Sequence, residues 1–380
     1  MPAAWQLLQA ARLTAIIQSL QDVRQLPQSL RFLGRTAIVP AADSEIMARF
    51  TGFVTIADLV ADDQQAVTYQ NTKLSYETTN IPNIKHGAAI TQAMLNQLQS
   101  LMENGGMPRD MGLFSNYENR TIDGLLLGVR QRMEALLVAM ACDGLTYDRL
   151  GIKMTNVTWG MPADLKVTPS VTWDTAATAT PVNDIWAVRR TGRVRYGQDF
   201  DRMSLSTQAF MYMIATTEFQ AKARTLLAPN VSYTNLTLAD LDAQRTLAQN
   251  VMGLREIELY DARYWTQNPD GALVSTPFLP ITKVVLSNSA DDNDPTATDF
   301  ANGITTESIV SGLAPSEMVG GVGGPTRGPI SYATVPADLN PPNIVYWAVA
   351  RGFPRKHRLQ STAVLTVGTF TDTIAVGPPF

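Results

Sequence analysis

Apolar side chains recur at intervals of three and four residues between positions 121 and 147. At 3.6 residues per turn this spacing places them along one side of a helix, and polar side chains such as Arg132 and Glu134 fall between the apolar rows. The apolar positions are Ile122, Leu125, Leu126, Val129, Met133, Leu136, Leu137 and Met140. The pattern predicts one amphipathic helix of roughly 35–40 Å, with Thr121 as N-cap and Gly144 at its end. We expect it to be the spine on which a sheet is laid.

The chain before this helix shows two other patterns of apolar and polar residues. Residues 3–33 have helical spacing in two pieces interrupted at Pro27, and this arm is too short to bury its own apolar side. Residues 50–85 instead alternate β-forming and polar residues, which predicts two strands joined near residues 70–72 in a long hairpin. A two-stranded hairpin alone is marginally stable in water. Both segments are therefore expected to pack against something else, and the hairpin against another chain.

The rest of the chain predicts a mixture of helices and strands. Helices are predicted over 88–103, from near Ser206, and from a capping-box pattern at Thr237 to about Met252. Strand patterns cover 151–171, 255–264, 281–286, 343–352 and 362–377, and 290–342 is predicted to be a long loop with short strands. This order favours an α+β middle region with its own core.

The composition is that of a folded protein with few charges. Of 380 residues, 45% are apolar and only 17% are charged, against about 25% in an ordinary soluble domain. Because interface cores are depleted in Lys, Glu and Asp, the low charge favours a surface covered by partners. No apolar run approaches the ~18 residues of a membrane span, and the N-terminus lacks the features of a secretory signal. We expect a soluble chain that is synthesised in the cytoplasm.

Candidate chemistry is sparse. The single cysteine, Cys142, lies in the apolar run and is interpreted as a small buried hydrophobe, and two histidines leave little material for catalysis or metal binding. The acidic run Asp291, Asp292 and Asp294 lacks EF-hand spacing and is interpreted as a solvated turn. The glycines at 320–324 lack the Lys-Ser/Thr of a phosphate-binding loop. No catalytic residue, cofactor or metal site is predicted.

Charge is unevenly distributed around a net charge of −4. The first 36 residues are locally basic, because one acid, Asp22, stands against Arg12, Arg24, Arg31 and Arg35. Two further basic clusters comprise Arg189, Arg190, Arg193 and Arg195, and Arg351, Arg355, Lys356, His357 and Arg358. Each cluster is interpreted as a solvated face, a phosphate contact, or one side of a salt bridge to a neighbouring molecule. The acidic residues Asp58, Asp62 and Asp63 are the candidate partners for that salt bridge.

Several stretches carry a resemblance to a known family. They are the spine segment NRTIDGLLLGVRQRMEALLVAMACDG and the stretch VTWDTAATATPVNDIWAVRR, with VVLSNSA and ARGFPRKHRLQSTAVL later in the chain. In the second stretch a Trp-containing strand, a Thr/Asp-rich turn and a Pro-x-x-Asp-Ile helix start follow one another. With the order of arm, hairpin, spine helix, middle region and late strands, the chain resembles the major capsid proteins of tailed phages with the Hong Kong 97 fold. Within that class it is most similar to the phage lambda major capsid protein, or capsid protein E, family.

The resemblance implies an α+β fold with four parts. These are an N-terminal arm at 1–48, an extended loop at 49–87, a peripheral domain at 88–168 that holds the spine helix and receives the C-terminal strands 351–380, and an axial domain at 169–350. In the extended loop the expected contacts with neighbouring subunits are Asp58, Asp62, Asp63, Tyr69, Lys73 and Tyr76. The arm residues expected to face DNA or a scaffold are Arg12, Arg24, Arg31 and Arg35. The basic candidates for contacts between subunits are Arg189, Arg190, Arg193, Arg195, Arg355, Lys356 and Arg358.

The function implied is that of a structural protein and not of an enzyme. Such a chain self-assembles into hexamers and pentamers of an icosahedral phage head, in the host cytoplasm, and encloses double-stranded DNA by non-specific contact. Further expected partners are portal and decoration proteins and a separate scaffold protein, because no long N-terminal scaffolding segment is evident; no membrane is involved. One family member joins a loop lysine to an asparagine. Lys73 lies in the corresponding loop, but no partner asparagine is identifiable, so no crosslink is expected.

Two other classes of protein compete with this interpretation. One is an encapsulin-like cellular nanocompartment, a shell of the same fold that holds cargo enzymes instead of DNA. The other is a soluble hydrolase that uses carboxylates. The content of purified particles distinguishes the first class, and a monomer with a closed apolar pocket would favour the second.

Overall fold

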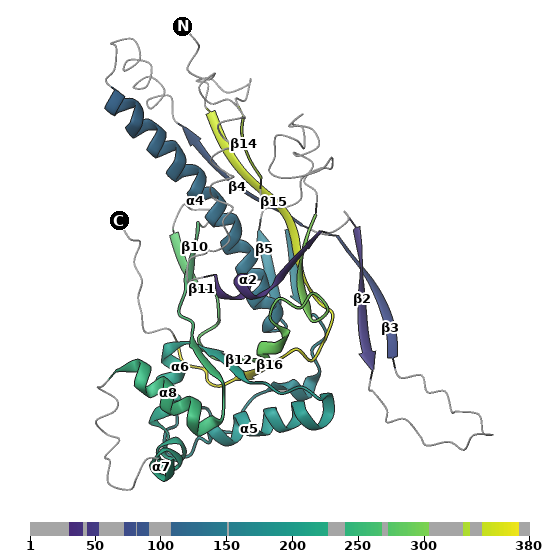
Figure 1. The fold of residues 1–380 in the computed structure, drawn as a ribbon, viewed down its shortest axis with the longest axis vertical. Helices are drawn as coiled ribbons and strands as arrows, with labels where there is room; N and C mark the ends of the chain where they lie inside the picture. The colour runs from purple at the N-terminus through teal and green to yellow at the C-terminus, as the bar shows by residue number, and fades with distance from the viewer. Residues whose placement is uncertain are drawn as a thin grey trace, which may run out of the picture.

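The structure is a computed structural model, and Figure 1 shows an elongated molecule with a long helix along its upper part and a group of shorter helices below. It describes residues 30–40, 44–52, 72–80, 82–90, 108–149, 152–226, 240–267, 273–303, 330–334 and 344–371. The helices are α2 (Arg31–Arg35), α4 (Pro108–Ala141), α5 (Pro181–Thr191), α6 (Thr207–Ala215), α7 (Thr217–Leu226) and α8 (Leu241–Met252), with the short turns η3 (Ala163–Leu165), η4 (Gly192–Tyr196) and η6 (Ser289–Asp291).

The strands belong to several sheets. In chain order they are β1 (Ala37–Pro40), β2 (Ser44–Gly52), β3 (Thr72–Asn80), β4 (Asn83–Ile90), β5 (Leu145–Arg149), β6 (Ile152–Val157), β7 (Lys166–Val167), β8 (Arg202–Leu205), β9 (Glu256–Leu259), β10 (Arg263–Gln267), β11 (Leu273–Pro277), β12 (Lys283–Ser287), β13 (Thr298–Asn302), β14 (Ile330–Thr334), β15 (Ile344–Lys356) and β16 (Thr362–Thr366).

The spine helix α4 is longer than the sequence pattern predicts. It begins at Pro108, so the prediction of Thr121 as N-cap is wrong. Its 34 residues span about 50 Å at 1.5 Å per residue. Proline is favoured at the start of a helix because its missing N–H has no helical partner there. The apolar rows themselves are confirmed, because the buried side chains of α4 include Leu125, Leu126, Val129, Met133, Leu136, Leu137 and Met140.

The C-terminal end of α4 also differs from the prediction by one residue. Asp143, and not Gly144, adopts the left-handed conformation, with φ of 50°. The N–H of Asp143 donates to the carbonyl of Met140 and the N–H of Gly144 to that of Ala139, both at 3.0 Å. This is the bonding pattern of a Schellman motif, which satisfies carbonyls left over at a helix end. Aspartate is among the few residues with a side chain that adopt this conformation readily.

A sheet packs along α4. Its order is β1-β13-β15-β14, and β4 also pairs with β15. The long strand β15 is antiparallel to β4 from Ile344 opposite Ile90 to Arg351 opposite Asn83. The predicted helix over 88–103 is therefore wrong at 88–90, which complete β4, and its remaining residues lie outside the described stretches. Helix α4 contacts both β15 and β4, so the spine and the sheet form one layered unit.

A second sheet, of order β7-β16-β12-β8-β9, lies below and carries α5 to α8 (Figure 1). Two helix starts were foreseen: Ser206 caps α6 by accepting the N–H of Ala209, and α5 begins at Pro181. Helix α8 ends at Met252 as predicted, but its N-cap is Asp240. Thr237, the predicted start, lies outside the described residues. Strand β16 belongs to this lower sheet, so the stretch 351–380, assigned as a whole to the peripheral domain, is divided between the two sheets.

The predicted hairpin exists, with different strands. It is formed by β2 and β3, paired antiparallel from Ser44 opposite Asn80 to Gly52 opposite Thr72. The predicted turn near residues 70–72 is wrong, because Thr72 already pairs within β3. Figure 1 shows this hairpin standing apart from the body, and among the described strands β2 and β3 pair only with each other. Alternation of residue types indicates strands but does not fix their register, which a turn or a packed face must supply.

The buried apolar side chains form one continuous cluster that runs from α4 to the lower sheet. Its largest buried members include Trp159, Trp173, Tyr260 and Phe300. The described helices include none that is long and apolar enough to cross a membrane.

Candidate functional site

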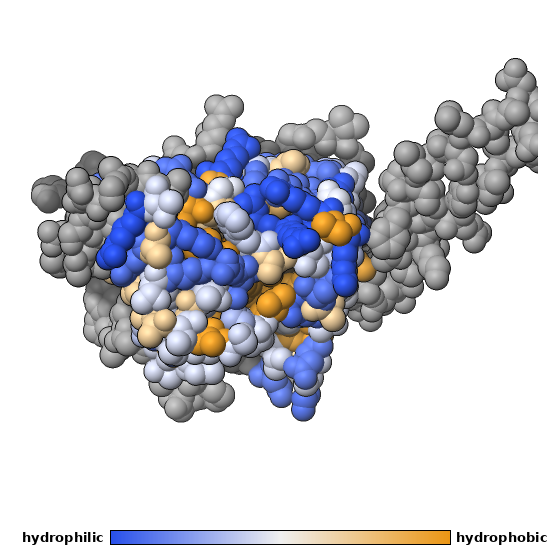
Figure 2. All heavy atoms as spheres, turned by 90° about the horizontal axis from the view of Figure 1, so that it is seen from below, coloured by the Kyte–Doolittle hydropathy of each residue, from blue (hydrophilic) through white to orange (hydrophobic). Residues whose placement is uncertain are grey.

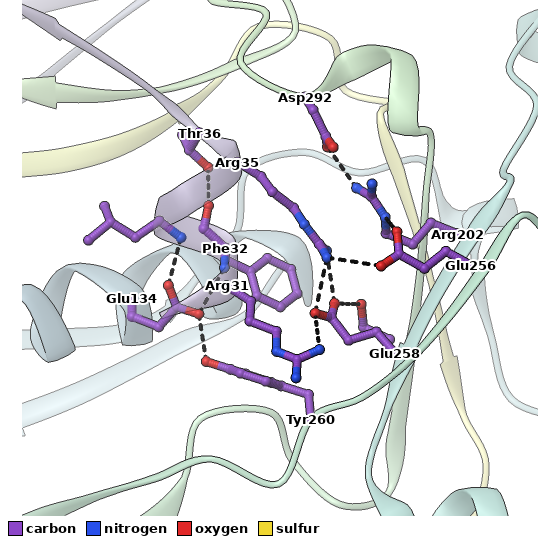
Figure 3. A network of polar contacts seen from close by, with 12 residues as sticks. Arg31, Phe32, Arg35, Thr36, Glu134, Arg202, Glu256, Glu258, Tyr260 and Asp292 are labelled. Carbon is purple, nitrogen blue, oxygen red and sulfur yellow. Dashed lines mark hydrogen bonds and ion pairs between the residues drawn. The ribbon is translucent and has the colours of Figure 1, made fainter. Parts of the chain in front are cut away.

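The carboxylate of Glu134 on α4 forms a seat for the arm helix α2. Its side chain is fully buried and accepts the backbone N–H groups of Phe32 (3.0 Å) and Leu33 (2.7 Å) and the hydroxyl of Tyr260 (2.6 Å). Burial raises the pKa of Glu134, while these hydrogen bonds oppose the rise. The sequence pattern placed Glu134 between the apolar rows of the helix and did not indicate that it is buried. A carboxylate withdrawn from water needs such partners, and here α2 supplies two of them (Figure 3).

Glu258 on β9 holds the other side of the arm helix. Its buried carboxylate accepts Arg31 Nη1 at 2.7 Å, Arg35 Nη1 at 2.8 Å and Ser204 Oγ at 2.9 Å. Burial alone would raise the pKa of Glu258, but the charge of Arg35 and the hydrogen bonds from both arginines outweigh it and lower that pKa. Figure 3 shows both arginines directed at this carboxylate. Two buried carboxylates, one on the spine and one on the lower sheet, thus fix the end of the arm.

This network extends over the edge of the lower sheet. Arg202 donates to Glu256 and to Asp292, each at 2.7 Å (Figure 3). Arg31 and Arg35, which sequence analysis assigned to DNA or a scaffold, have their charges matched within the subunit. Arg12 and Arg24, assigned in the same way, lie outside the described residues.

The first basic cluster surrounds the π-helical turn η4 and is also paired internally. Arg193 donates twice to Asp199, at 2.9 and 2.8 Å, which raises the pKa of Arg193. Arg195 donates to Asp164 at 2.8 Å. Arg189 donates to the carbonyls of Met252 and Gly253 at the end of α8, at 2.9 and 3.0 Å. Arg190 is exposed on α5.

The second basic cluster fastens β15 to β13 and to the acidic turn. Arg355 makes a bidentate pair with Asp299, at 2.7 and 2.6 Å. Arg358 donates to Asp291 at 2.6 Å. The expectation of a solvated acidic turn is wrong, because Asp291 and Asp292 each pair with an arginine. Among the described residues, no group of acids, histidines and cysteine is placed to hold a metal ion.

Lys356 is the most buried member of that cluster, with 2% of its surface exposed. Its ammonium donates to Thr362 Oγ1 at 2.7 Å, and Thr362 in turn donates to the carbonyl of Ala141 at the end of α4. Burial lowers the pKa of Lys356 to about 7. A contact between subunits through this side chain is excluded by its burial, and Lys356 instead joins α4, β15 and β16.

A groove of 1030 Å³ opens between α4, β4, the hairpin β5–β6 and β10. Its lining includes His86, Arg132, Leu136, Tyr147, Ile152 and Trp265. The guanidinium of Arg132 lies 5.2 Å from the ring centre of Tyr147 and 5.7 Å from that of Tyr264. Within the described part of the chain, no carboxylate lies at ion-pair distance from Arg132. Trp265 and Ile152 are each 36% exposed at this groove.

Exposed apolar side chains also occur on the lower helices. Trp186 on α5 is 52% exposed, Val194 on η4 is 76% exposed and Met211 on α6 is 37% exposed. Figure 2 views the molecule from below and shows hydrophobic spots separated by hydrophilic side chains. Lys222 lies 5.3 Å from the ring centre of Trp186 and partly covers it. The apolar surface of this face is therefore scattered and does not form one patch.

The residues assigned to the extended loop are described only in part. Lys73 and Tyr76 lie in β3. Asp58, Asp62, Asp63 and Tyr69 fall between β2 and β3, outside the described residues. Sequence reasoning missed the anchoring role of Glu134, Glu258 and Tyr260. The contacts of Glu134 and Glu258 with α2, and of Glu134 with Tyr260, join residues more than a hundred positions apart in the chain. Periodicity within one segment carries no signal for such contacts.

Comparisons with known proteins give one consistent result. A family model described as phage major capsid protein E matches residues 9–300. The crystal structure of the putative capsid protein of a prophage of E. coli CFT073 aligns with a TM-score of 0.56 and 13% identity, over 94% of this chain and 99% of that one. A phage-related protein from Bordetella bronchiseptica RB50 aligns with a TM-score of 0.51 and 12% identity, over 93% and 95% of the two chains. No curated protein matches the sequence.

Proposed function

The chain belongs to the phage major capsid protein E family, and from this premise we propose that its subunits assemble into the hexamers and pentamers of an icosahedral head. It is a phage major capsid protein and a component of the virion capsid. The fold is mixed α+β, Hong Kong 97-like, and similar to that of a solved putative prophage capsid protein and that of a solved phage-related protein. The family indicates a structural role rather than an enzymatic one. It favours neither the nanocompartment shell nor the hydrolase.

The observation that carries the proposal is the hairpin β2–β3. Its strands of nine residues each extend roughly 30 Å and pair, among the described strands, only with each other. An isolated hairpin is marginally stable in water, so it needs a surface to lie on. In a shell that surface belongs to a neighbouring subunit. Contacts exchanged in this way add up over many copies, so no single contact has to be strong.

The anchored arm helix supports the same proposal. Glu134 and Glu258 fix α2 to the body, which gives the chain before residue 30 a defined point of departure. Arg12 and Arg24 in that preceding stretch are the candidates for non-specific contact with packaged double-stranded DNA or with a scaffold, because Arg31 and Arg35 are already paired with Glu258. Portal and decoration proteins are the further partners, and the host cytoplasm is the place of assembly.

Deleting the hairpin tests the proposal. Residues 44–80 are replaced by a short Gly/Ser linker, and the full-length chain is expressed in parallel. We expect the shortened chain to fold, as judged by circular dichroism and a cooperative unfolding transition, and to form no shells in negative-stain electron microscopy. The full-length chain provides the shells for comparison. Normal particles from the shortened chain would show that the hairpin does not join subunits.

A further inference from the structure

Arg132 brings a positive charge into the groove beside α4, and no described carboxylate lies at ion-pair distance from it. The centre of its guanidinium lies 5.2 Å from the ring centre of Tyr147 and 5.7 Å from that of Tyr264. Contacts with rings engage the faces of a guanidinium and leave its N–H edges able to bind an anion in their own plane. Asp148, the one acid among the described lining residues, lies 3.8 Å from Lys153 instead. The groove therefore offers a cation that two rings hold in place.

An imidazole lies one helical turn from this guanidinium. His86 on β4 is exposed and lines the groove, and a methyl group added at Gly128 would clash with Nδ1 and Cε1 of its ring. Gly128 and Arg132 are four residues apart, so they lie on the same face of α4. The glycine thus lets the ring of His86 rest on the helix beside Arg132. Because a guanidinium and an imidazole both donate N–H groups, the pair fits the several acceptor oxygens of a phosphate.

Arginines that already hold a carboxylate of their own subunit are less available to an anion. Arg355 in the second basic cluster, for example, makes its bidentate pair with Asp299. An incoming anion there would have to displace that carboxylate. At the groove, by contrast, Lys85 is a second cation among the lining residues beside Arg132. The electrostatic surroundings of the groove therefore favour an anionic ligand.

In the same groove an aromatic face is left open. Trp265 on β10 lines the groove and is 36% exposed, whereas Trp159 and Trp173 are buried in the core. An indole in a concave site offers a flat apolar surface to a planar ring. Nucleobases stack on such rings in proteins that bind unpaired strands, with little preference for sequence. A phosphate and a base occur together in a nucleotide, so the groove holds the complement of both parts of that ligand.

The dimensions of the groove agree with a ligand of this size. Its volume of 1030 Å³ is close to the upper end of the roughly 300–1,000 Å³ of small-molecule sites. Its lining includes the apolar side chains of Val129, Leu136 and Met154, and in such sites a few polar groups fix the orientation of the ligand. The bases of a duplex are stacked inside it and cannot reach an indole. Only a free nucleotide or an unpaired unit of a strand therefore has both of its parts accessible.

We propose that the groove around Arg132 is a nucleotide-binding site, for a free nucleotide or for an unpaired unit of a nucleic acid strand. The phosphate binds the N–H edge of Arg132 and the imidazole of His86, and the base stacks on Trp265. The inference goes beyond the proposed function, which requires only non-specific contact with double-stranded DNA. It is also independent of assembly, because all of these residues belong to one subunit.

Calorimetric titration of the full-length chain with thymidine 5′-monophosphate is the first test. We expect saturable binding of one nucleotide per subunit. Thymidine and inorganic phosphate are each expected to bind at least tenfold more weakly, because each of them keeps only one of the two contacts. Inorganic phosphate bound as tightly as the nucleotide would overturn the proposal, since the base would then contribute nothing.

Two further probes identify the source of the nucleotide. A short oligothymidylate that binds at least tenfold more tightly than the mononucleotide assigns the site to an unpaired strand, and a smaller difference assigns it to a free nucleotide. A duplex of the same length is expected to bind at least tenfold more weakly than the oligothymidylate. Saturable binding of neither the mononucleotide nor the oligothymidylate, or equal binding of the duplex, would overturn the proposal.

Variants of the two phosphate-binding side chains are the second test. Arg132→Gln is expected to weaken nucleotide binding at least tenfold, and His86→Gln at least threefold. Arg224→Gln, at an exposed position on α7, is the matched control and is expected to bind like the unmodified chain. Each variant is checked for a cooperative unfolding transition, and the change at His86 is at an exposed side chain. Binding by both groove variants at the affinity of the control would overturn the proposal.

Tryptophan fluorescence tests the position of the base. A base stacked on Trp265 is expected to quench its emission, so Trp265→Leu should abolish the quenching and weaken nucleotide binding at least tenfold. Trp186→Leu is the matched control, because that indole is 52% exposed on α5 and does not line the groove. Quenching that survives in Trp265→Leu and disappears in Trp186→Leu would overturn the assignment.

The outcomes for the groove and for the shell are distinguishable. If the chain forms shells and binds no nucleotide, the site is wrong while the capsid function stands. If the chain binds the nucleotide in the groove and forms no shells under any assembly condition, the proposed assembly fails while the site stands.

Discussion

The hydroxyl of Tyr260 donates a hydrogen bond of 2.6 Å to Oε1 of Glu134, although 126 positions separate the two residues in the chain. Both side chains are buried, and burial together with the nearby Glu134 charge raises the pKa of Tyr260 far above its ordinary range. The bond joins the spine helix to the chain leaving β9. The arm helix α2 sits on the same carboxylate, so one side chain of α4 holds two distant parts of the subunit together.

Replacing that carboxylate is expected to loosen the arm. In Glu134→Gln one carboxylate oxygen becomes an amide NH₂, which cannot accept from Phe32, Leu33 or Tyr260. Because at least one buried donor then loses its acceptor, we expect the free energy of unfolding to fall by about 1–3 kcal/mol. Hydrogen exchange at the Phe32 and Leu33 amides should become faster. Glu256→Gln is the control, since that carboxylate is 41% exposed, and a change of similar size there would contradict a special role for Glu134.

Because Lys356 is buried and its pKa is lowered, we expect the free energy of unfolding to depend on pH. Its folded pKa of about 7 lies below the ~10.4 of an unfolded chain. Below pH 7 both states bind the proton, and the cost of burying the charge, on the order of 4 kcal/mol, is fully present. Between pH 7 and about 10 the unfolded state binds more protons than the folded state, so stability rises with pH. Asp143, Lys166 and Cys142 face this amine, and the thiol titrates above that window.

Lys356→Met should remove this dependence. We expect the variant to be more stable than the unmodified chain at pH 7, and the difference to shrink as the pH approaches 10. The measurement is the denaturant midpoint of unfolding at several pH values. Lys153→Met is the control, because that side chain is 72% exposed and its removal should leave the slope unchanged. Equal slopes for all three proteins would show that Lys356 does not titrate near pH 7.

Replacing glycine by alanine is expected to have opposite effects on stability at two positions, Gly352 and Gly124. A methyl group at Gly352 in β15 would press against the ring of Phe300 and lie 3.0 Å from the carbonyl oxygen of Ala301, whereas at Gly124 in α4 it would meet nothing within 4 Å. Gly352→Ala should therefore destabilise the subunit by about 1–3 kcal/mol. Gly124→Ala should stabilise it by about 0.5–1 kcal/mol through helix propensity. Thermal unfolding of both variants gives the comparison, and a shift in the same direction for both would refute this interpretation.

Replacing the arm residues Arg12 and Arg24 is expected to reduce the DNA content of the particles and to leave folding of the subunit unchanged. We expect Arg12→Gln combined with Arg24→Gln to form shells that retain less DNA, since fewer phosphates are neutralised, and retention should fall further as salt is raised. Arg224→Gln is the matched control. The DNA content of purified particles is measured as the ratio of the ultraviolet absorbance of nucleic acid to that of protein. Unchanged DNA in the double variant, at both low and high salt, would remove these two residues from the candidates.

Sequence periodicity predicted those features of helices and strands that depend on a single segment and on which of its faces packs against the core. The apolar rows of α4, the cap at Ser206, the start of α5 at Pro181 and the end of α8 all follow from local spacing and local backbone preferences. The start of α4 at Pro108 was missed because weak helix formers such as Gly112 and Asn116 follow it. The hairpin was foreseen as a kind of element, but its register was not, because no packed face specifies it.

Charge clusters in the sequence proved a poor guide to exposed charge in the fold. Arg355 and Asp299 are 56 positions apart and meet because β15 pairs with β13. Glu134 follows a buried methionine and stands between the apolar rows, and the sequence pattern did not indicate that α2 and Tyr260 enclose it. Arg132 in the same helix stands between apolar rows, and that spacing does not indicate its contacts with Tyr147 and Tyr264. Its significance comes from two tyrosines that other elements bring to it.

The position of β16 determines when a subunit is able to finish folding. This strand follows β7, β8, β9 and β12 in the chain, yet it lies between β7 and β12 in the sheet. During synthesis the ribosome releases the flanking strands first, and the gap between them stays open until β16 emerges. The lower sheet is therefore completed only after residues 362–366 have been translated. A nascent subunit therefore lacks a complete lower sheet until β16 has joined it.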